Sequence, residues 1–201
     1  LAKINLGSTG KNPSVGCIIE RNGTVLSSGF TSIGGRPHAE FNALNKKKIN
    51  FKGANAYITL EPCSHYGKTP PCTNIIKNKK IKKVFFSIND LDERSKNLSK
   101  KILFKDKIYS KKNILRNYGN DFYKSYILDK ENRIPLIDGK IAISKDFFTK
   151  DKKKKFITNE ISRKTGQLLR SRYDCLITTS NTINDDNSIM DVRINGLEEK
   201  S

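Results

Sequence analysis

The sequence predicts an α/β protein in which a mixed β-sheet is covered by helices. Two observations support this fold class. First, apolar runs at residues 15–20 and 24–30 flank Asn22-Gly23, a dipeptide that supplies the two positive φ angles of a tight hairpin turn. Second, strand-like and helix-like segments alternate after this antiparallel pair, which is typical of a sheet with helices packed on it.

The remaining elements of the first half follow from local composition. Pro37 is well placed just ahead of a first helical turn. Residues 1–6 look like the last turns of a helix, and because the first residue is Leu1 rather than Met we expect a fragment. In chain order after the hairpin we expect a helix at 38–47, a strand at 54–60, a turn-rich loop at 61–71, a helix at 73–80 and a strand at 84–88.

The pattern weakens between residues 90 and 133, where Lys-rich helix and loop with a short strand near 107–109 are expected. We place a domain boundary near Asn132, which gives a first domain at 1–131 and an incomplete α/β domain at 132–201. The second part is expected to contain strands at 140–143 and 174–178 and a helix at 159–172, capped by Thr158 or Asn159.

The net charge of +19 has two interpretations. Clustered Lys and Arg bind nucleic acid through phosphate contacts, and they also attract a phosphorylated small substrate. However, lysines spread along the whole chain among many Asn and Ile residues indicate a compositional bias and a solvated surface. No apolar run reaches the roughly 18 residues of a membrane span and no leader is visible, so we expect a cytoplasmic protein without a membrane partner.

Four cysteines without a secretory signal argue against a disulfide framework. Cys17 and Cys175 lie in apolar, strand-like runs, and we expect both thiols to be buried in the core. Cys63 and Cys72 lie at the ends of expected elements, where they are available as metal ligands.

Three zinc-capable side chains and one carboxylate fall at element ends. His38-Ala39-Glu40 opens a helix, Cys63 follows a strand, and Cys72 begins the next helix. Helix N-termini favour thiolates, so we expect lowered thiol pKa values there. His38, Cys63 and Cys72 are therefore expected to bind Zn²⁺ and to leave a fourth position for water, as in catalytic zinc sites.

In zinc-dependent nucleobase deaminases, a Glu two residues after the His moves protons between the attacking water and the departing ammonia. Glu40 occupies this offset, and we expect it to be the catalytic residue. Two simpler interpretations stay open. Glu40 could be a carboxylate favoured at a helix N-terminus, and His65 could complete a closed, structural zinc site.

The spacing of the cysteines departs from the short Pro-Cys-x-x-Cys signature, because eight residues separate Cys63 from Cys72. The segment Glu61-Pro-Cys-Ser-His-Tyr-Gly-Lys-Thr-Pro-Pro-Cys72, together with residues 12–17 and 37–40, closely resembles the deaminase domain of the bifunctional riboflavin-biosynthesis deaminase-reductases. The resemblance is strong over about residues 1–90 and looser to the end. It implies a three-layer, cytidine-deaminase-like domain with helices on both sheet faces, followed by an incomplete reductase domain.

The resemblance implies hydrolytic deamination of 2,5-diamino-6-(5-phosphoribosylamino)pyrimidin-4(3H)-one to 5-amino-6-(5-phosphoribosylamino)uracil. It also implies NADPH-dependent ribose reduction by the C-terminal domain of a full-length protein. Relatives commonly assemble, so a homo-oligomer is compatible with it. The matching substrate-binding positions are Asn12, His65 and Lys68, although Asn12 beside Pro13 also suits a turn and Lys68 also suits a solvated loop. Thr31 stands where relatives usually carry His.

On the reductase side, Lys140, Ser144 and Asp146 match the family's K-x-A-x-S-x-D motif, with Phe147 in place of the usual Gly that follows. Thr182 and Asp186 match a T-V-x-x-D-D-P loop, and Arg193 matches the Arg after it. Since most of that domain is absent, no reduction is expected from this chain. The alternative function is a cytosine or adenosine deaminase acting on nucleic acid, which the charge favours and the long cysteine loop opposes.

Overall fold

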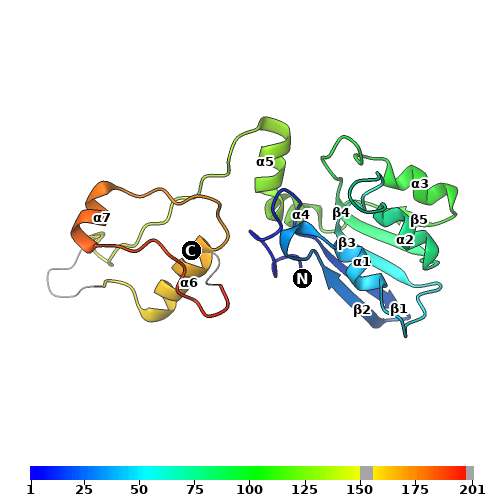
Figure 1. The fold of residues 1–201 in the computed structure, drawn as a ribbon, viewed down its shortest axis with the longest axis horizontal. Coiled ribbons are helices and arrows are strands. Elements are labelled where there is room, and N and C mark those ends of the chain that lie inside the picture. Colours follow the sequence, from blue (N-terminus) through cyan, green and yellow to red (C-terminus); the bar gives the residue numbers. More distant parts are fainter. Residues whose placement is uncertain (150–155, 198–201) are drawn as a thin grey trace. The chain divides into compact units, whose positions relative to one another are not determined.

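The computed structural model describes residues 1–149 and 156–197, with the side chains of Asn132 and Asp186 also outside the described part. The chain forms two compact units, Leu1–Leu136 and Ile137–Ser201, which we call the N-terminal and C-terminal units (Figure 1). The assignment of these units to a deaminase and a reductase domain stays a prediction. No described helix is long and apolar enough to cross a membrane.

The N-terminal unit is built on a mixed sheet of five strands in the order β2-β1-β3-β4-β5. β1 pairs antiparallel with β2 and β3, whereas β3, β4 and β5 run parallel to one another. This is the mixed sheet that the sequence predicts. The strands are β1 (Gly16–Arg21), β2 (Thr24–Phe30), β3 (Asn55–Leu60), β4 (Lys83–Ile88) and β5 (Tyr109–Lys111).

The opening hairpin forms as predicted. Asn22 and Gly23 have φ angles of 53° and 79°, the two positive values that a tight turn of this type needs. The Glu20 carboxylate accepts a hydrogen bond from the Gly23 N–H at 2.6 Å, which closes the turn.

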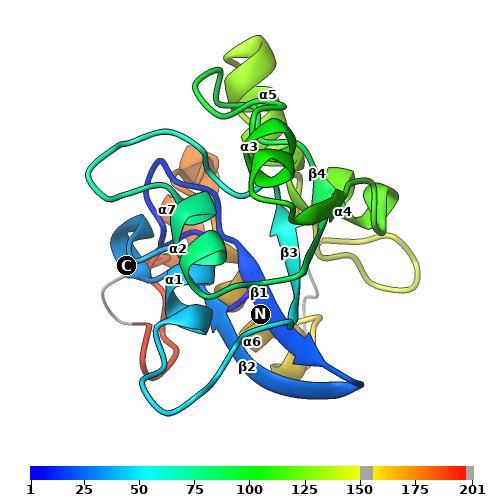
Figure 2. The same cartoon turned by 90° about the vertical axis from the view of Figure 1, so that its right-hand side faces the viewer.

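Helices cover both faces of the sheet. One face carries Cys17, Ile19, Ala56, Ile58 and Val84, and it is buried in the core beside three helices: α1 (Ala39–Leu44), α2 (Cys72–Asn78) and α3 (Ser99–Lys105). On the opposite face Tyr123, at the junction of α4 (Arg116–Phe122) and α5 (Lys124–Asn132), contacts Thr59 of β3. Figure 2 shows α2 and α4 on opposite sides of the strands.

Several element boundaries differ from the prediction. The helix expected at 38–47 ends at Leu44, because Asn45 leaves the helical region at φ −86° and ψ 50°. The short strand expected at 107–109 begins at Tyr109, since Lys107 has a φ of 58°. Residues 1–6 form successive turns rather than a helix, with hydrogen bonds three residues apart such as Ile4 N–H to Leu1 O, and Gly7 follows with a φ of 80°.

The C-terminal unit contains α6 (Glu160–Arg170) and α7 (Ser180–Asp186) in its described part. Asn159 caps α6 as predicted, accepting a hydrogen bond from Ser162 N–H. The strands expected at 140–143 and 174–178 are not formed: both segments lack regular secondary structure and pair with no neighbouring strand in the described chain. Without a sheet to bury it Ile177 is 87% exposed, and Cys175 is exposed rather than a core residue.

Candidate metal centre and active site

His38 is positioned at the start of α1, where it is the N-cap residue with extended backbone angles. Helix α1 lies close against β2 because Gly29 has no side chain. A Cβ atom at Gly29 would lie 2.4 Å from both Ala39 O and Ala43 N. This close approach fixes the first turn of α1, and with it His38 and Glu40, over the buried face of the sheet.

The two cysteines are brought together by a closed loop between β3 and α2. Cys63 follows Glu61 and Pro62 at the end of β3, and Cys72 is the first residue of α2. The backbone N–H of Cys72 donates to Cys63 Sγ at 3.2 Å, and Thr73 N–H donates to Cys63 O at 3.2 Å. The eight residues between the cysteines therefore form a loop whose two ends are held together by hydrogen bonds.

His38, Cys63 and Cys72 form a group whose ligand atoms all lie within 4.8 Å of one another. His38 Nδ1 is 3.6 Å from Cys63 Sγ and 3.4 Å from Cys72 Sγ. Tetrahedral zinc, with bonds of about 2.1 Å to nitrogen and about 2.3 Å to sulfur, separates such atoms by about 3.6 Å. The three side chains thus fit a zinc ion bound through Nδ1 of the histidine, and they leave one corner for another ligand.

The two thiols differ in acidity. Hydrogen bonds from Cys72 and His38 outweigh burial and lower the pKa of Cys63 to about 4. The pKa of Cys72 is raised well above its usual value, because its proton bonds to Cys63 and the site is buried. Helix N-termini are expected to lower both thiol pKa values. In the metal-free protein the pKa falls only at Cys63, which follows β3 and is lowered by its hydrogen bonds, and it rises at Cys72, the first residue of α2. A bound cation would reverse this effect at Cys72, since coordination favours the thiolate.

Glu40 lies in the first turn of α1 and is only 4% exposed. Burial raises the pKa of its carboxyl group to about 7, and the neighbouring Cys63 thiolate adds to this shift. The pKa of His38 is raised by its hydrogen bond to Cys63. The site thus places a buried carboxyl group that readily exchanges a proton next to the three candidate ligands.

The three candidate substrate-binding residues lie in different settings. His65 is half-buried, and its Nδ1 is 2.6 Å from Ser95 Oγ, so it is not part of the metal group. Lys68 is exposed in the loop between the cysteines. Asn12 donates to Gly35 O at 3.1 Å and so braces the 3-10 turn (Ile33–Gly35) that precedes His38.

Thr31, which stands where relatives usually carry His, has a structural role. It is buried, and its hydroxyl group accepts the Val15 N–H at 2.9 Å. The side chain therefore ties β1 to the end of β2.

Sequence reasoning missed Glu61, whose buried carboxylate accepts four hydrogen bonds. The donors are the N–H groups of Asp90, Asn97 and Ser99 and the hydroxyl group of Ser99. Glu61 thereby joins the end of β3 to the loop before α3. A carboxylate directly beside Pro62-Cys63 was visible in the sequence, but its distant partners were not.

Arg36 was also missed. Its guanidinium group donates to Thr69 Oγ1 at 2.7 Å and so links the segment before α1 to the loop between the cysteines. Its positive charge opposes the upward shift of the His38 pKa.

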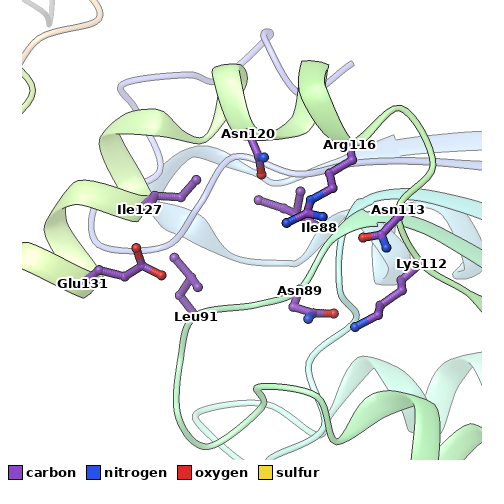
Figure 3. A pocket seen from close by; sticks show the side chains of 9 residues that line it. All are labelled: Ile88, Asn89, Leu91, Lys112, Asn113, Arg116, Asn120, Ile127 and Glu131. Atoms are coloured by element: carbon purple, nitrogen blue, oxygen red, sulfur yellow. The ribbon is translucent and has the colours of Figure 1, made fainter.

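A hollow of about 510 Å³ lies between the ends of β4 and β5 and helices α4 and α5 (Figure 3). Arg116, Lys112 and three asparagines line it together with Ile127 and Glu131. None of the residues that the sequence singled out for the deaminase site lines this hollow.

The structure only partly brings together the residues assigned to the reductase side. The Lys140 side chain lies beside Gly166 of α6, where an added Cβ would be 2.9 Å from Lys140 Cε, and the Arg193 N–H donates to the adjacent Gln167. Ser144 instead donates to Asp146, within a local turn. Thr182 lies in the first turn of α7, capped by Thr179, and the Asp186 side chain is outside the described part.

The chain is similar to several known proteins. The family described as "Cytidine and deoxycytidylate deaminase zinc-binding region" matches residues 2–88. The riboflavin biosynthesis protein RibD of Haemophilus influenzae is 35% identical over 92% of this chain and 50% of its own length. RibD of Buchnera aphidicola is 37% identical over 96% of this chain and 52% of its own length.

Solved structures of deaminase/reductases are also similar to this chain. The crystal structure of a diaminohydroxyphosphoribosylaminopyrimidine deaminase/5-amino-6-(5-phosphoribosylamino)uracil reductase from Thermotoga maritima matches with a TM-score of 0.88 and 29% identity. The match covers 98% of this chain and 57% of that chain. The chain thus spans about half the length of the curated relatives it matches.

Proposed function

Since the chain belongs to the RibD family of riboflavin-biosynthesis proteins, we propose that its N-terminal unit is a zinc-dependent pyrimidine deaminase. The proposed substrate is 2,5-diamino-6-(5-phosphoribosylamino)pyrimidin-4(3H)-one, and the product is 5-amino-6-(5-phosphoribosylamino)uracil. The reaction replaces an exocyclic amino group by oxygen from water and releases ammonia.

One observation carries this proposal: three ligand atoms converge at the separations of a tetrahedral zinc site, with a buried carboxyl group beside them. His38 Nδ1 and the two cysteine sulfurs would hold the ion. When bound there, zinc supplies Lewis acidity that makes water a nucleophile near neutral pH. His65 is engaged by Ser95, so a closed four-ligand structural site finds no support in the described residues.

Glu40 has the role of proton carrier. Its carboxylate takes a proton from the attacking water and delivers protons to the pyrimidine ring nitrogen and then to the departing amine. A carboxyl group whose pKa is raised by burial to about 7 both accepts and releases a proton near neutral pH, which suits this cycle.

We propose Lys68, His65 and Asn12 as the residues that bind the substrate. Lys68 is exposed in the loop between the cysteines and would pair with the phosphate group, and His65 of the same loop would contribute a ring nitrogen. Asn12, whose side chain donates to Gly35 O, would be a further substrate contact. The high positive charge of the chain would attract this anionic substrate.

The NADPH-dependent reduction of the ribose is proposed only for a full-length family member. Lys140 and Arg193, which lie beside neighbouring residues of α6, are the residues of this chain that we propose for that site. Ser144, Asp146, Thr182 and Asp186 are proposed for it on sequence alone.

An ammonia-release assay on the zinc-loaded chain tests the function. We expect turnover of the pyrimidine ribotide and about one zinc per chain. Single-stranded DNA and RNA are tested as alternative substrates in the same assay, because a net charge of +19 also favours the binding of polyanions. Deamination of nucleic acid with none of the ribotide would contradict the proposal.

A further inference from the structure

Ser95 lies in the loop between β4 and α3 and is 0% exposed. Its hydroxyl oxygen accepts the Ser64 N–H at 3.2 Å and lies 2.6 Å from His65 Nδ1. Ser64 and His65 directly follow Cys63. A buried hydroxyl group from another loop therefore contacts the segment that carries a candidate metal ligand and a candidate substrate-binding residue.

The loop of Ser95 is held in place by Glu61. The Glu61 carboxylate accepts the N–H groups of Asp90 and Asn97, which lie on either side of Ser95 in the chain. The Ser95 N–H in turn donates to Asp92 O at 2.8 Å. These hydrogen bonds hold the backbone that carries the Ser95 hydroxyl group in place.

The direction of the Ser95–His65 hydrogen bond follows from counting donors and acceptors. The Ser95 oxygen already accepts one hydrogen bond, from Ser64. If it also accepted an Nδ1–H of His65, the hydroxyl hydrogen would be buried without an acceptor among the described residues, which costs free energy. If Ser95 donates to Nδ1 instead, the hydroxyl group and Nδ1 are both satisfied, and the ring proton of neutral His65 must lie on Nε2.

We propose that Ser95 is a positioning residue that fixes His65 as its Nε2–H tautomer and aims this donor at an oxygen atom of the substrate. This inference rests on the proposed deaminase function. In this role Ser95 does not touch substrate but acts through the imidazole ring.

The surroundings of Nε2 suit an oxygen-rich group. A Cβ atom built on Gly67 would lie 3.7 Å from His65 Nε2 and 3.5 Å from Arg36 Nη2. Two donors therefore lie close to the exposed Gly67, which has no side chain to contact them. Because both are donors, the group that fits there is an acceptor, such as a carbonyl or phosphoryl oxygen.

Nitrogen-15 NMR of the histidine rings tests the tautomer without any activity measurement. The chain has only two histidines, so two ring systems are expected, and a His65→Gln variant assigns them. In the zinc-loaded chain at alkaline pH, where imidazole is neutral, we expect His65 to show a protonated Nε2 and an unprotonated Nδ1. A protonated Nδ1 would overturn the proposal.

Substitution of Ser95 tests the positioning role. In Ser95→Ala the Nδ1 resonance of His65 should shift, because the nitrogen loses its donor. We expect KM to rise about threefold to tenfold and kcat to change less than about twofold, since one hydrogen bond to substrate is loosened. Ser95→Thr keeps the hydroxyl group and should restore both the Nδ1 resonance and KM. Unchanged KM and unchanged His65 resonances in a folded Ser95→Ala protein would refute the role.

Ser87→Ala is the matched control, because Ser87 is also buried and donates one hydrogen bond, to Leu115 O, on the other sheet face. It should alter neither the His65 resonances nor KM. If the unsubstituted chain released no ammonia from the ribotide, the proposed function and the substrate contact would fail together. The NMR result would still decide whether Ser95 fixes the tautomer.

Discussion

Glu40 is the residue on which the proposed chemistry depends. A carboxylate at a helix N-terminus is common and is favoured by the helix dipole, so its position alone does not indicate catalysis. Glu40 is distinguished by its burial beside two sulfur atoms, which raises its pKa to about 7. A carboxyl group kept in such an unfavourable setting is typical of a functional site.

We predict that Glu40→Gln retains zinc and loses turnover by a factor of about 10² to 10⁴, the usual contribution of general acid–base catalysis. Zinc content and ammonia release measured on the same preparation check this. Glu160→Gln is the control, since Glu160 is exposed and forms an ion pair with Lys164. Full activity in Glu40→Gln would exclude the proton-carrier role.

At the scale of elements, the site depends on how closely α1 approaches the sheet. Gly29 lies opposite Cys17 in the hairpin and faces the first turn of α1. Protein interiors adjust little to added volume, so a larger residue here must displace the helix that carries His38 and Glu40.

We predict that Gly29→Ala costs about 1 to 3 kcal/mol in the free energy of unfolding and weakens zinc binding, because the added Cβ overlaps the α1 backbone. Denaturant unfolding and competition with a zinc chelator measure the two effects. Gly139→Ala, where a Cβ meets nothing within 4 Å, should change neither. Unaltered zinc affinity in Gly29→Ala would show that α1 is not held by this contact.

Glu61 connects elements that are distant in the chain. In Glu61→Gln one oxygen acceptor becomes an NH₂ donor facing other donors, so we expect the unfolding free energy to fall by about 3 kcal/mol. The matched variant Glu20→Gln alters a partly exposed carboxylate that also accepts two hydrogen bonds, and its effect should be much smaller. Thermal and denaturant unfolding compare the two variants. An equal loss of unfolding free energy in both would show that the buried Glu61 hydrogen bonds have no special stabilising role.

At the scale of the whole molecule, the metal group joins segments that the sequence separates. Its ligands come from the start of α1, the loop after β3 and the start of α2, all within the N-terminal unit. A bound ion therefore acts as a cross-link in the folded state only.

We predict that zinc removal by a chelator lowers the melting temperature of the N-terminal unit. At free zinc one hundred times the dissociation constant, the stabilisation lost is about 2.7 kcal/mol. Differential scanning calorimetry measures this loss. Cys63→Ser should abolish the dependence on zinc, whereas Cys175→Ser should preserve it because Cys175 is exposed and outside the group. Identical melting of the unsubstituted chain with and without chelator would contradict zinc binding.

The sequence by itself determined the features that depend on local chemistry. Asn22-Gly23 specified the hairpin turn because few residues tolerate two consecutive positive φ angles. Residues 37–40 and 61–72 indicated the family through residue types at fixed spacing, and the comparisons confirm that family. The roles of His38, Glu40, Cys63 and Cys72 stay predictions, although the structure brings them together.

Only the tertiary structure decided the features that depend on distant partners. The strands expected at 140–143 and 174–178 carry apolar residues but find no paired strand among the residues that the structure describes, since strand formation needs hydrogen bonds from another segment. Likewise, Glu61 and Ser95 are ordinary polar residues in the sequence. They gain their significance because folding buries each of them against backbone or ring groups about 30 or more residues away, and a buried polar group must find its partners there.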